Sequence, residues 1–237
     1  MTDVLGCVAW AAFFLLASVW IPFVGPFLGL LAPLPFLYYS TKLGFYQGVK
    51  LAALSILITG LIAKFAGHTQ IILFGLEFSL LGLALSELFK RQLSVGQTIF
   101  LATSFMLLLG IGFLFFLALS RNMGPGEMIL KYLEGHLNLT IKAYEEIGIS
   151  QDKAIELEAY GKVFMGTISK IYPALMTIGT GFLVWLNVVI AKPLFSIKNI
   201  DYPQFTPMDR WQAPDVLVWA VIVSGFALFL ASGGIKL

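Results

Sequence analysis

The chain has 237 residues, of which 59% are apolar and 12% charged, and its formal net charge is +2. Soluble domains average roughly 45–50% apolar and about 25% charged residues, so a water-exposed fold of this length could not bury so much apolar surface. The small net charge excludes a broad basic surface for nucleic acid, and the single cysteine, Cys7, excludes a disulfide within these residues. The composition therefore predicts a protein surrounded by lipid.

The first apolar stretch of the chain is too long to be one membrane-spanning helix. Residues 4–41 contain no charged side chain. One helix of that length would measure roughly 57 Å, whereas the hydrocarbon core of a bilayer is about 30 Å thick. Pro22, Gly25 and Pro26 interrupt a helix, because proline lacks the amide donor and glycine frees the backbone. We therefore predict two segments that meet at these residues.

The second of these segments, about residues 27–41, is short and contains Pro33 and Pro35. Irregular backbone at membrane depth persists only where protein or a wet cavity surrounds it, since lipid offers no hydrogen bonds. We therefore expect Pro22, Pro26, Pro33 and Pro35 to mark a backbone break that borders a cavity.

Including these two, the chain contains seven apolar segments. They give seven spans, or six if the first two form one re-entrant unit. They cover residues of about 4–21, 27–41, 44–64, 69–88, 92–120, 171–191 and 214–235. The fold class that they predict is all-α: a polytopic transmembrane helical bundle. About five spans form an N-terminal bundle over residues 1–120. A C-terminal pair occupies residues 171–237, around a proline- and aromatic-rich loop at 193–213.

Residues 121–170, between spans five and six, have a different composition, with many charged side chains of both signs. One apolar stripe at three- and four-residue spacing predicts an amphipathic helix; it consists of Leu130, Leu133, Leu137, Ile141 and Tyr144. Gly148 ends this helix in our interpretation, and Ser150 caps a second helix that runs on into span six. The resulting hairpin lies outside the bilayer core, either as a solvated cap or as an element that docks a membrane protein partner.

The distribution of basic residues predicts the orientation of the bundle. One side carries more of them than the other: Lys42, Lys50, Lys90, Arg91, Lys192, Lys198 and Arg210, against Lys64, Arg121, Lys170 and Lys236. Because short cytoplasmic loops are enriched in lysine and arginine, we expect a cytoplasmic N-terminus in a bacterial cytoplasmic membrane.

Glu77 is the most informative single residue, because it lies near the middle of span four. An ionised carboxylate at the bilayer centre costs about 2.5–3.5 kcal/mol, so Glu77 is protonated, paired or exposed to a cavity. Lys50 on the preceding span is the nearest basic candidate, at a depth that a water molecule could bridge. Two readings stay open: a carboxylate that binds a ligand or ion together with Lys50, or a protonated glutamate bonded to a neighbouring helix.

Asn187 in span six either faces a cavity as a ligand-binding amide or makes a hydrogen bond between helices. Pairs of small residues at four-residue spacing, such as Gly44 with Gly48 and Gly82 with Ser86, indicate close helix packing. No metal-ligand cluster, phosphate loop or paired nucleophile and base is present in the sequence. We therefore expect neither an enzyme nor a bound cofactor or metal.

Two stretches resemble one family. The first runs from Pro33-x-Pro35 through Leu37-Tyr38-Tyr39 to Lys42-Leu43-Gly44. The second, residues 205–215, reads Phe-Thr-Pro-Met-Asp-Arg-Trp-Gln-Ala-Pro-Asp. Together with the amphipathic insert, they resemble the YybS-like bacterial integral membrane proteins, a family without an established function. That family is distantly similar to the substrate-binding S components of energy-coupling-factor transporters, which implies a bundle that captures a small molecule. The family pattern continues with further hydrophobic sequence, so the resemblance implies a truncated bundle here.

Two functions remain open at this point. The broken second segment, Glu77 and the resemblance favour a small-molecule transporter or substrate-capture subunit. The helical hairpin and the lack of catalytic motifs favour a non-transporting membrane scaffold or regulator that acts through a protein partner. The first predicts an enclosed polar cavity beside Glu77 or residues 33–50, and the second predicts a tightly filled bundle.

Overall fold

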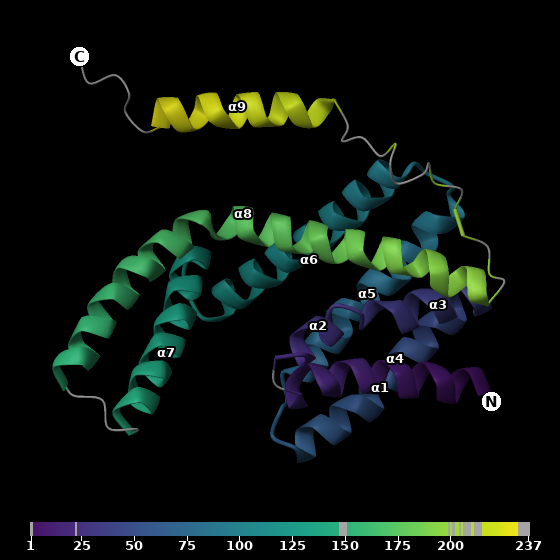
Figure 1. Cartoon of the computed structure of the whole chain (residues 1–237), viewed down its shortest axis with the longest axis horizontal. Helices are drawn as coiled ribbons and strands as arrows, with labels where there is room; N and C mark the ends of the chain where they lie inside the picture. The colour runs from purple at the N-terminus through teal and green to yellow at the C-terminus, as the bar shows by residue number, and fades with distance from the viewer. Residues whose placement is uncertain are drawn as a thin grey trace. The chain divides into compact units, whose positions relative to one another are not determined.

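The structure is a computed structural model that describes every residue except 1, 22, 147–150, 199, 201, 204, 206–209, 211–214 and 232–237. Over the described residues the chain is all-α (Figure 1). The helices are α1 (Thr2–Trp20), α2 (Gly25–Gly29), α3 (Pro33–Leu43), α4 (Phe45–Phe65), α5 (Ile71–Lys90), α6 (Val95–Ser120), α7 (Pro125–Glu146), α8 (Gln151–Ile197) and α9 (Val216–Ala231).

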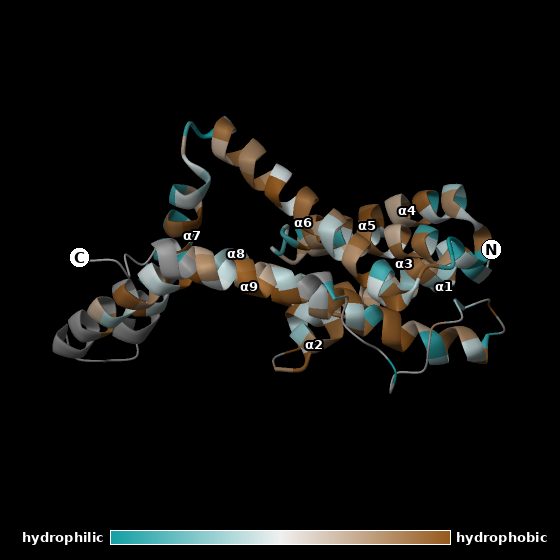
Figure 2. Cartoon of the chain, turned by 90° about the horizontal axis from the view of Figure 1, so that it is seen from above, coloured by the Kyte–Doolittle hydropathy of each residue, from teal (hydrophilic) through white to brown (hydrophobic). Residues whose placement is uncertain are grey.

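Five of these helices are long and apolar enough to cross a membrane: α1, α4, α5, α6 and the Ala159–Ile197 part of α8. In α6, hydrophobic residues extend along the helix (Figure 2), and its most apolar window has a mean hydropathy of 2.4. Large apolar side chains such as Leu108 and Phe116 are exposed there, by 70% and 66%. A helix with such an outer surface needs lipid rather than water around it, so the predicted membrane bundle is confirmed.

The predicted segments correspond to helices, with two informative differences. The segment at 27–41 is not one helix but the short pair α2 and α3, each too short to cross a bilayer alone. The segment at 171–191 is part of α8, a continuous helix of 47 residues that begins in the predicted hairpin. Its length corresponds to roughly 70 Å, more than twice the hydrocarbon thickness, so one part of α8 extends beyond the bilayer core.

The described chain divides into two compact units. Unit 1 comprises residues 1–102 and 187–237, and unit 2 comprises residues 103–186. In unit 2, α7 and the first part of α8 lie side by side as a hairpin (Figure 1). The Leu137 side chain lies against Gly161, where an added Cβ atom would come within 2.6 Å of it. The predicted three-part division at residues 120 and 170 stays a prediction.

Helix α3 is the centre of unit 1, because every residue from Ala32 to Ser40 is buried. It packs against α1, α4 and α5. Helix α5 approaches α3 closely at Gly82, where an added Cβ atom would lie 2.6 Å from the Pro33 carbonyl oxygen. A side chain at position 82 would therefore separate α3 from α5, which gives the predicted small-residue packing a specific partner.

The ends of α1 show that α2 and α3 together cross back through the bundle. At one end, Lys42 at the end of α3 forms an ion pair with Asp3 at the start of α1. At the other end, an added Cβ atom on Gly25 of α2 would lie 2.4 Å from the Ala17 carbonyl oxygen. The 19 residues from Gly25 to Leu43, at about 1.5 Å per residue, approach the bilayer thickness of about 30 Å. The pair is therefore a broken crossing rather than a re-entrant loop.

Antiparallel pairing continues into α4 and α5. Gly44, with a φ of +90°, ends α3 and lets the chain turn directly into α4. Further along, Gly60 of α4 lies against Ile72 of α5. A Cβ atom added to Gly60 would lie 2.8 Å from the Ile72 side chain. The end of α3, the start of α4 and the end of α5 therefore share one end of unit 1, which we call the Asp3 end. Lys42, Lys50 and Lys90 are on the side to which the sequence assigned them.

Candidate functional site at the broken crossing

The break between α2 and α3 has a tight, 3₁₀-like backbone. Three successive amides donate to the carbonyl three residues back: Leu31 to Leu28, Ala32 to Gly29 and Leu34 to Leu31. Pro33 and Pro35 interrupt this pattern because neither has an amide hydrogen. The proline pair therefore accounts for a break that a regular helix would not have. Pro26 lies in the first turn of α2, where a missing donor is tolerated, and Pro22 lies outside the described residues.

The tightened turn leaves one backbone carbonyl available inside the protein. In a regular helix the Leu34 amide would donate to Leu30, but here it donates to Leu31. The Leu30 carbonyl oxygen instead accepts a hydrogen bond of 2.9 Å from Nδ2 of Asn187. Asn187 is completely buried on α8, 157 residues away in sequence. Backbone polar groups at membrane depth need internal partners, so this side-chain amide replaces the missing helical bond.

A group of aromatic rings fixes the last turns of α8 against α3 and α5. Phe195 is fully buried and packs edge-on against Tyr38 of α3, Phe89 of α5 and Tyr202, with ring centroids 6.0–6.1 Å apart. The Tyr202 hydroxyl donates to the Val188 carbonyl oxygen at 2.8 Å. Desolvation by burial raises the pKa of Tyr202, so its hydroxyl stays a neutral donor. The group places Asn187 two turns of helix away from Phe195, at the level of the break.

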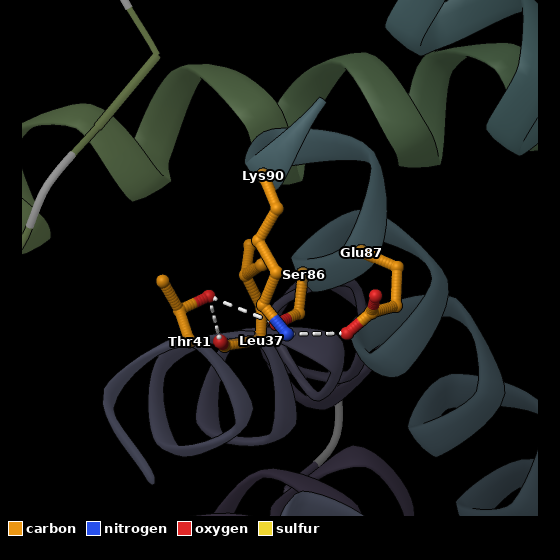
Figure 3. Close-up of polar contacts among 5 residues, drawn as sticks. All are labelled: Leu37, Thr41, Ser86, Glu87 and Lys90. Atoms are coloured by element: carbon orange, nitrogen blue, oxygen red, sulfur yellow. Dashed lines mark hydrogen bonds and ion pairs between the residues drawn. The ribbon is translucent and has the colours of Figure 1, made fainter. Parts of the chain in front are cut away.

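A polar contact between α3 and α5 lies at the Asp3 end (Figure 3). The Thr41 hydroxyl lies 2.8 Å from the Leu37 carbonyl oxygen and 3.2 Å from the hydroxyl of fully buried Ser86. Next to it on α5, Lys90 and Glu87 form an ion pair. These contacts hold the end of α3, whereas Asn187 holds its beginning.

The structure does not bring Glu77 and Lys50 into contact with the break. Glu77 is exposed on α5 and Lys50 is exposed on α4. Antiparallel pairing of Gly60 with Ile72 puts Glu77 level with Ser55, about five residues or roughly 8 Å along the axis from Lys50. Among the described residues neither side chain forms an ion pair. Their role as ligand- or ion-binding residues stays a prediction.

The structure has an open, apolar groove of about 720 Å³ between α4 and α5, whose lining includes neither Glu77 nor the break. The enclosed polar cavity stays a prediction. In the described part of the chain, no three His, Cys, Asp or Glu residues could hold a metal ion together. At the break, the structure offers hydrogen bonding by backbone carbonyls and by the buried Asn187 amide.

Sequence reasoning found the prolines and Asn187 but missed what joins them. The Leu30 carbonyl carries no side-chain signature, and the ring group of Phe195, Phe89 and Tyr202 brings together three distant positions. One signal was available: two prolines two residues apart must free carbonyls in the preceding turn, and a buried amide is a suitable donor for one of them. The second quoted motif lies mostly outside the described residues.

Comparison with known families places the chain. Residues 9–236 match the family described as "predicted membrane protein (DUF2232)". The chain belongs to this family. A relative is the uncharacterized protein YybS of Bacillus subtilis (strain 168), 23% identical over 214 residues. The match covers 88% of this chain and 66% of the relative, so the chain spans just under two thirds of that protein's length. No solved structure gives a significant match, and the similarity to transporter S components stays a prediction.

The family membership confirms the predicted YybS-like resemblance and an integral membrane protein. In the DUF2232 chain described here, the match runs across both compact units. It therefore includes the broken crossing, the hairpin and α9.

Proposed function

We propose that this protein is a transporter or substrate-capture subunit for a small molecule in a bacterial cytoplasmic membrane. One observation carries the proposal: a membrane crossing is interrupted inside the bundle, and its backbone carbonyl is held by the buried Asn187 amide. Transporters build substrate sites from discontinuous helices, whose free backbone groups bind ligands at membrane depth. No chemical step, cofactor or metal is part of the proposal.

The Asn187–Leu30 bond would then be a resting contact that a ligand can replace. A ligand with a hydrogen-bond donor can take the Leu30 carbonyl, and one with an acceptor can take Nδ2 of Asn187. Both groups are neutral, so the proposal favours a polar, uncharged ligand group at this point. Without a ligand, an unbonded Leu30 carbonyl and an unbonded Asn187 amide would each be costly in a dry interior. The two groups therefore stay bonded to each other until a ligand replaces the bond.

Thermal stability of the purified chain in detergent tests the capture role. A panel of water-soluble vitamins serves as probes, and we expect at least one to raise the melting temperature. A ligand at 100 times its dissociation constant adds about 2.7 kcal/mol to the free energy of unfolding. Asn187→Ala should lose most of this shift, while Asn138→Ala, an exposed position on α7, should keep it. Glu77→Gln tests the predicted carboxylate in the same assay, and unchanged binding would remove it from the site.

Access of water-soluble reagents to the break gives a second test. In a Cys7→Ser background, Leu31→Cys in proteoliposomes should react with a small charged thiol reagent. Leu81→Cys, fully buried on α5, should stay unlabelled. If no vitamin shifts the melting temperature and Leu31→Cys is as unreactive as Leu81→Cys, the break is only structural and the proposal is wrong.

A scaffold or regulatory role is the alternative, and the hairpin favours it. Tyr160, Val163 and Phe164 on α8 are exposed by 66–73%, so apolar surface is available outside the core of unit 2. Exposed apolar patches mark interaction sites in many proteins. Val163→Glu combined with Phe164→Glu should then reduce recovery of a stoichiometric membrane partner, relative to Lys170→Gln. Equal recovery, or no partner with either chain, would count against this role.

A further inference from the structure

The open groove between α4 and α5 has a simple origin in the sequence. Its floor consists of small side chains, Ala52, Ala53 and Gly60 on α4 and Ser79 on α5. In the antiparallel pair Ala53 lies level with Ser79, so little side-chain volume fills the groove at that level. The volume of about 720 Å³ lies within the range of roughly 300–1,000 Å³ for small-molecule pockets.

The groove opens outward from two helices that are each able to cross a membrane. Its walls are apolar along their length, from Val49 and Leu83 near the Asp3 end to Ile72 near the opposite end. An apolar hollow on the outside of a transmembrane helix pair faces the hydrocarbon chains of lipids. The groove follows the helix axes for the 16 residues from Val49 to Lys64, a rise of roughly 22 Å. This length matches an extended acyl chain in one leaflet and its adjoining region.

Lys64 is the charged residue of the groove lining, and it lies one residue before the end of α4. The polar turn that follows, with His68, Thr69 and Gln70, marks this level as the membrane interface. Lys64 takes part in neither ion pair of the described residues. The sequence contains no acidic residue between Asp3 and Glu77, so neither the end of α4 nor the start of α5 supplies a carboxylate beside Lys64. A cation at the interface end of an apolar groove complements an anionic headgroup above an acyl chain.

We propose that the α4–α5 groove binds one anionic phospholipid, with an acyl chain between Ala53 and Ser79 and the headgroup phosphate at Lys64. The site is separate from the broken crossing and does not depend on the proposed transport role. A lipid held there would add packing contacts along the groove surface of both helices. The bound lipid would therefore stabilise the α4–α5 pair.

Native mass spectrometry of the purified full chain, with dioleoyl phosphatidylglycerol or dioleoyl phosphatidylcholine added, tests the site. We expect one retained phosphatidylglycerol and about fivefold lower occupancy by phosphatidylcholine, the ratio that one interfacial lysine supports. Lys64→Gln should abolish that preference. Lys50→Gln, an exposed lysine of the same helix outside the groove, should leave it unchanged.

A groove-filling substitution tests the acyl-chain position. Ala53→Trp should displace the lipid, whereas Leu54→Trp, next to it but outside the lining, should not. Both positions are exposed, so neither substitution disturbs the core. Equal binding of the two lipids by every variant would overturn the proposal. So would an Ala53→Trp chain that keeps its lipid but loses a dimer or a bound polypeptide, because the groove would then be a protein interface.

Discussion

Prolines have opposite effects in two regions of the chain, the break before α3 and the long helix α8. In unit 1, Pro33 and Pro35 separate α2 from α3, and the freed Leu30 carbonyl is bonded by Asn187. In α8, by contrast, Pro173 and Pro193 both lie within one continuous helix and are exposed. Pro173 and Pro193 lie 20 residues apart and each removes one amide donor from α8, whereas Pro33 and Pro35 remove two donors within a single turn. A broken membrane helix therefore needs both the prolines that interrupt it and a protein environment around it. Helix α3 is buried, and the Asn187 amide supplies a hydrogen bond to the freed Leu30 carbonyl.

The largest expected effect tests the packing around α3. Gly82→Ala should lower the free energy of unfolding by about 1–3 kcal/mol, because its Cβ atom would meet the Pro33 carbonyl and Phe36. Gly112→Ala in α6, where an added Cβ atom meets nothing within 4 Å, should leave stability unchanged or raise it. Chemical denaturation in detergent measures both. Similar values for the two variants would contradict a tightly packed α3.

The second prediction concerns the replaced hydrogen bond. Asn187→Ala should cost about 1–2 kcal/mol, because the Leu30 carbonyl loses its donor inside the bundle. Asn138→Ala on exposed α7 is the matched control and should be neutral within about 0.5 kcal/mol. If the control destabilised the protein as much as Asn187→Ala, the bond would have no special role.

The third prediction uses the ring group that holds α8. Tyr202→Phe should lower stability by about 0.5–1.5 kcal/mol through loss of the bond to Val188. Burial raises the pKa of Tyr202 above its ordinary value of 10.0, so the unfolded chain releases this proton first. The stabilisation is therefore complete below about pH 10 and declines as the pH rises further.

Melting temperatures measured from pH 8 to 11 check this sign. The wild-type advantage over Tyr202→Phe should shrink with rising pH. Tyr160→Phe, at an exposed position of α8, should parallel the wild type throughout. An advantage that grew with pH would contradict the buried, neutral hydroxyl.

The smallest effect separates a contact between helices from one within a helix. Thr41→Val removes the hydroxyl contact between α3 and Ser86 and should cost about 0.6 kcal/mol. Thr177→Val in α8 removes only a bond to the Pro173 carbonyl of its own helix, 2.8 Å away, and should cost less. The reverse order in denaturation experiments would show that α8 depends on its proline turn more than α3 depends on α5.

Much of the fold was predictable because apolar length and helix breakers act locally. The charge-free stretch from 4 to 41 predicted two segments, and the prolines at 33 and 35 predicted a backbone break surrounded by protein or by a cavity. Helix α3 is buried, and the cavity stays a prediction. The alternation of charged and apolar residues predicted the hairpin. It also predicted that the second helix of the hairpin, which is the start of α8, continues into span six. These signals depend on a single segment and its solvent.

The site was less predictable, because its partners are distant in sequence. Glu77 drew attention as a carboxylate at mid-span, yet its position on the outer side of α5 depends on how α3 and α4 pack. Asn187 was identified, and its hydrogen-bonding alternative matches the observed bond to Leu30. No local pattern could have named a backbone carbonyl 157 residues away as its acceptor.

The central claim is that α2 and α3 together cross the membrane as a broken, internal segment. Phe23 and Tyr46 flank the pair and are exposed by 90% and 83%. In a Cys7→Ser background, Phe23→Cys and Tyr46→Cys can each be labelled with a membrane-impermeant maleimide in sealed vesicles of known orientation. The account predicts that the two cysteines react from opposite sides of the membrane. Labelling of both from the same side would make the segment a re-entrant loop and contradict it.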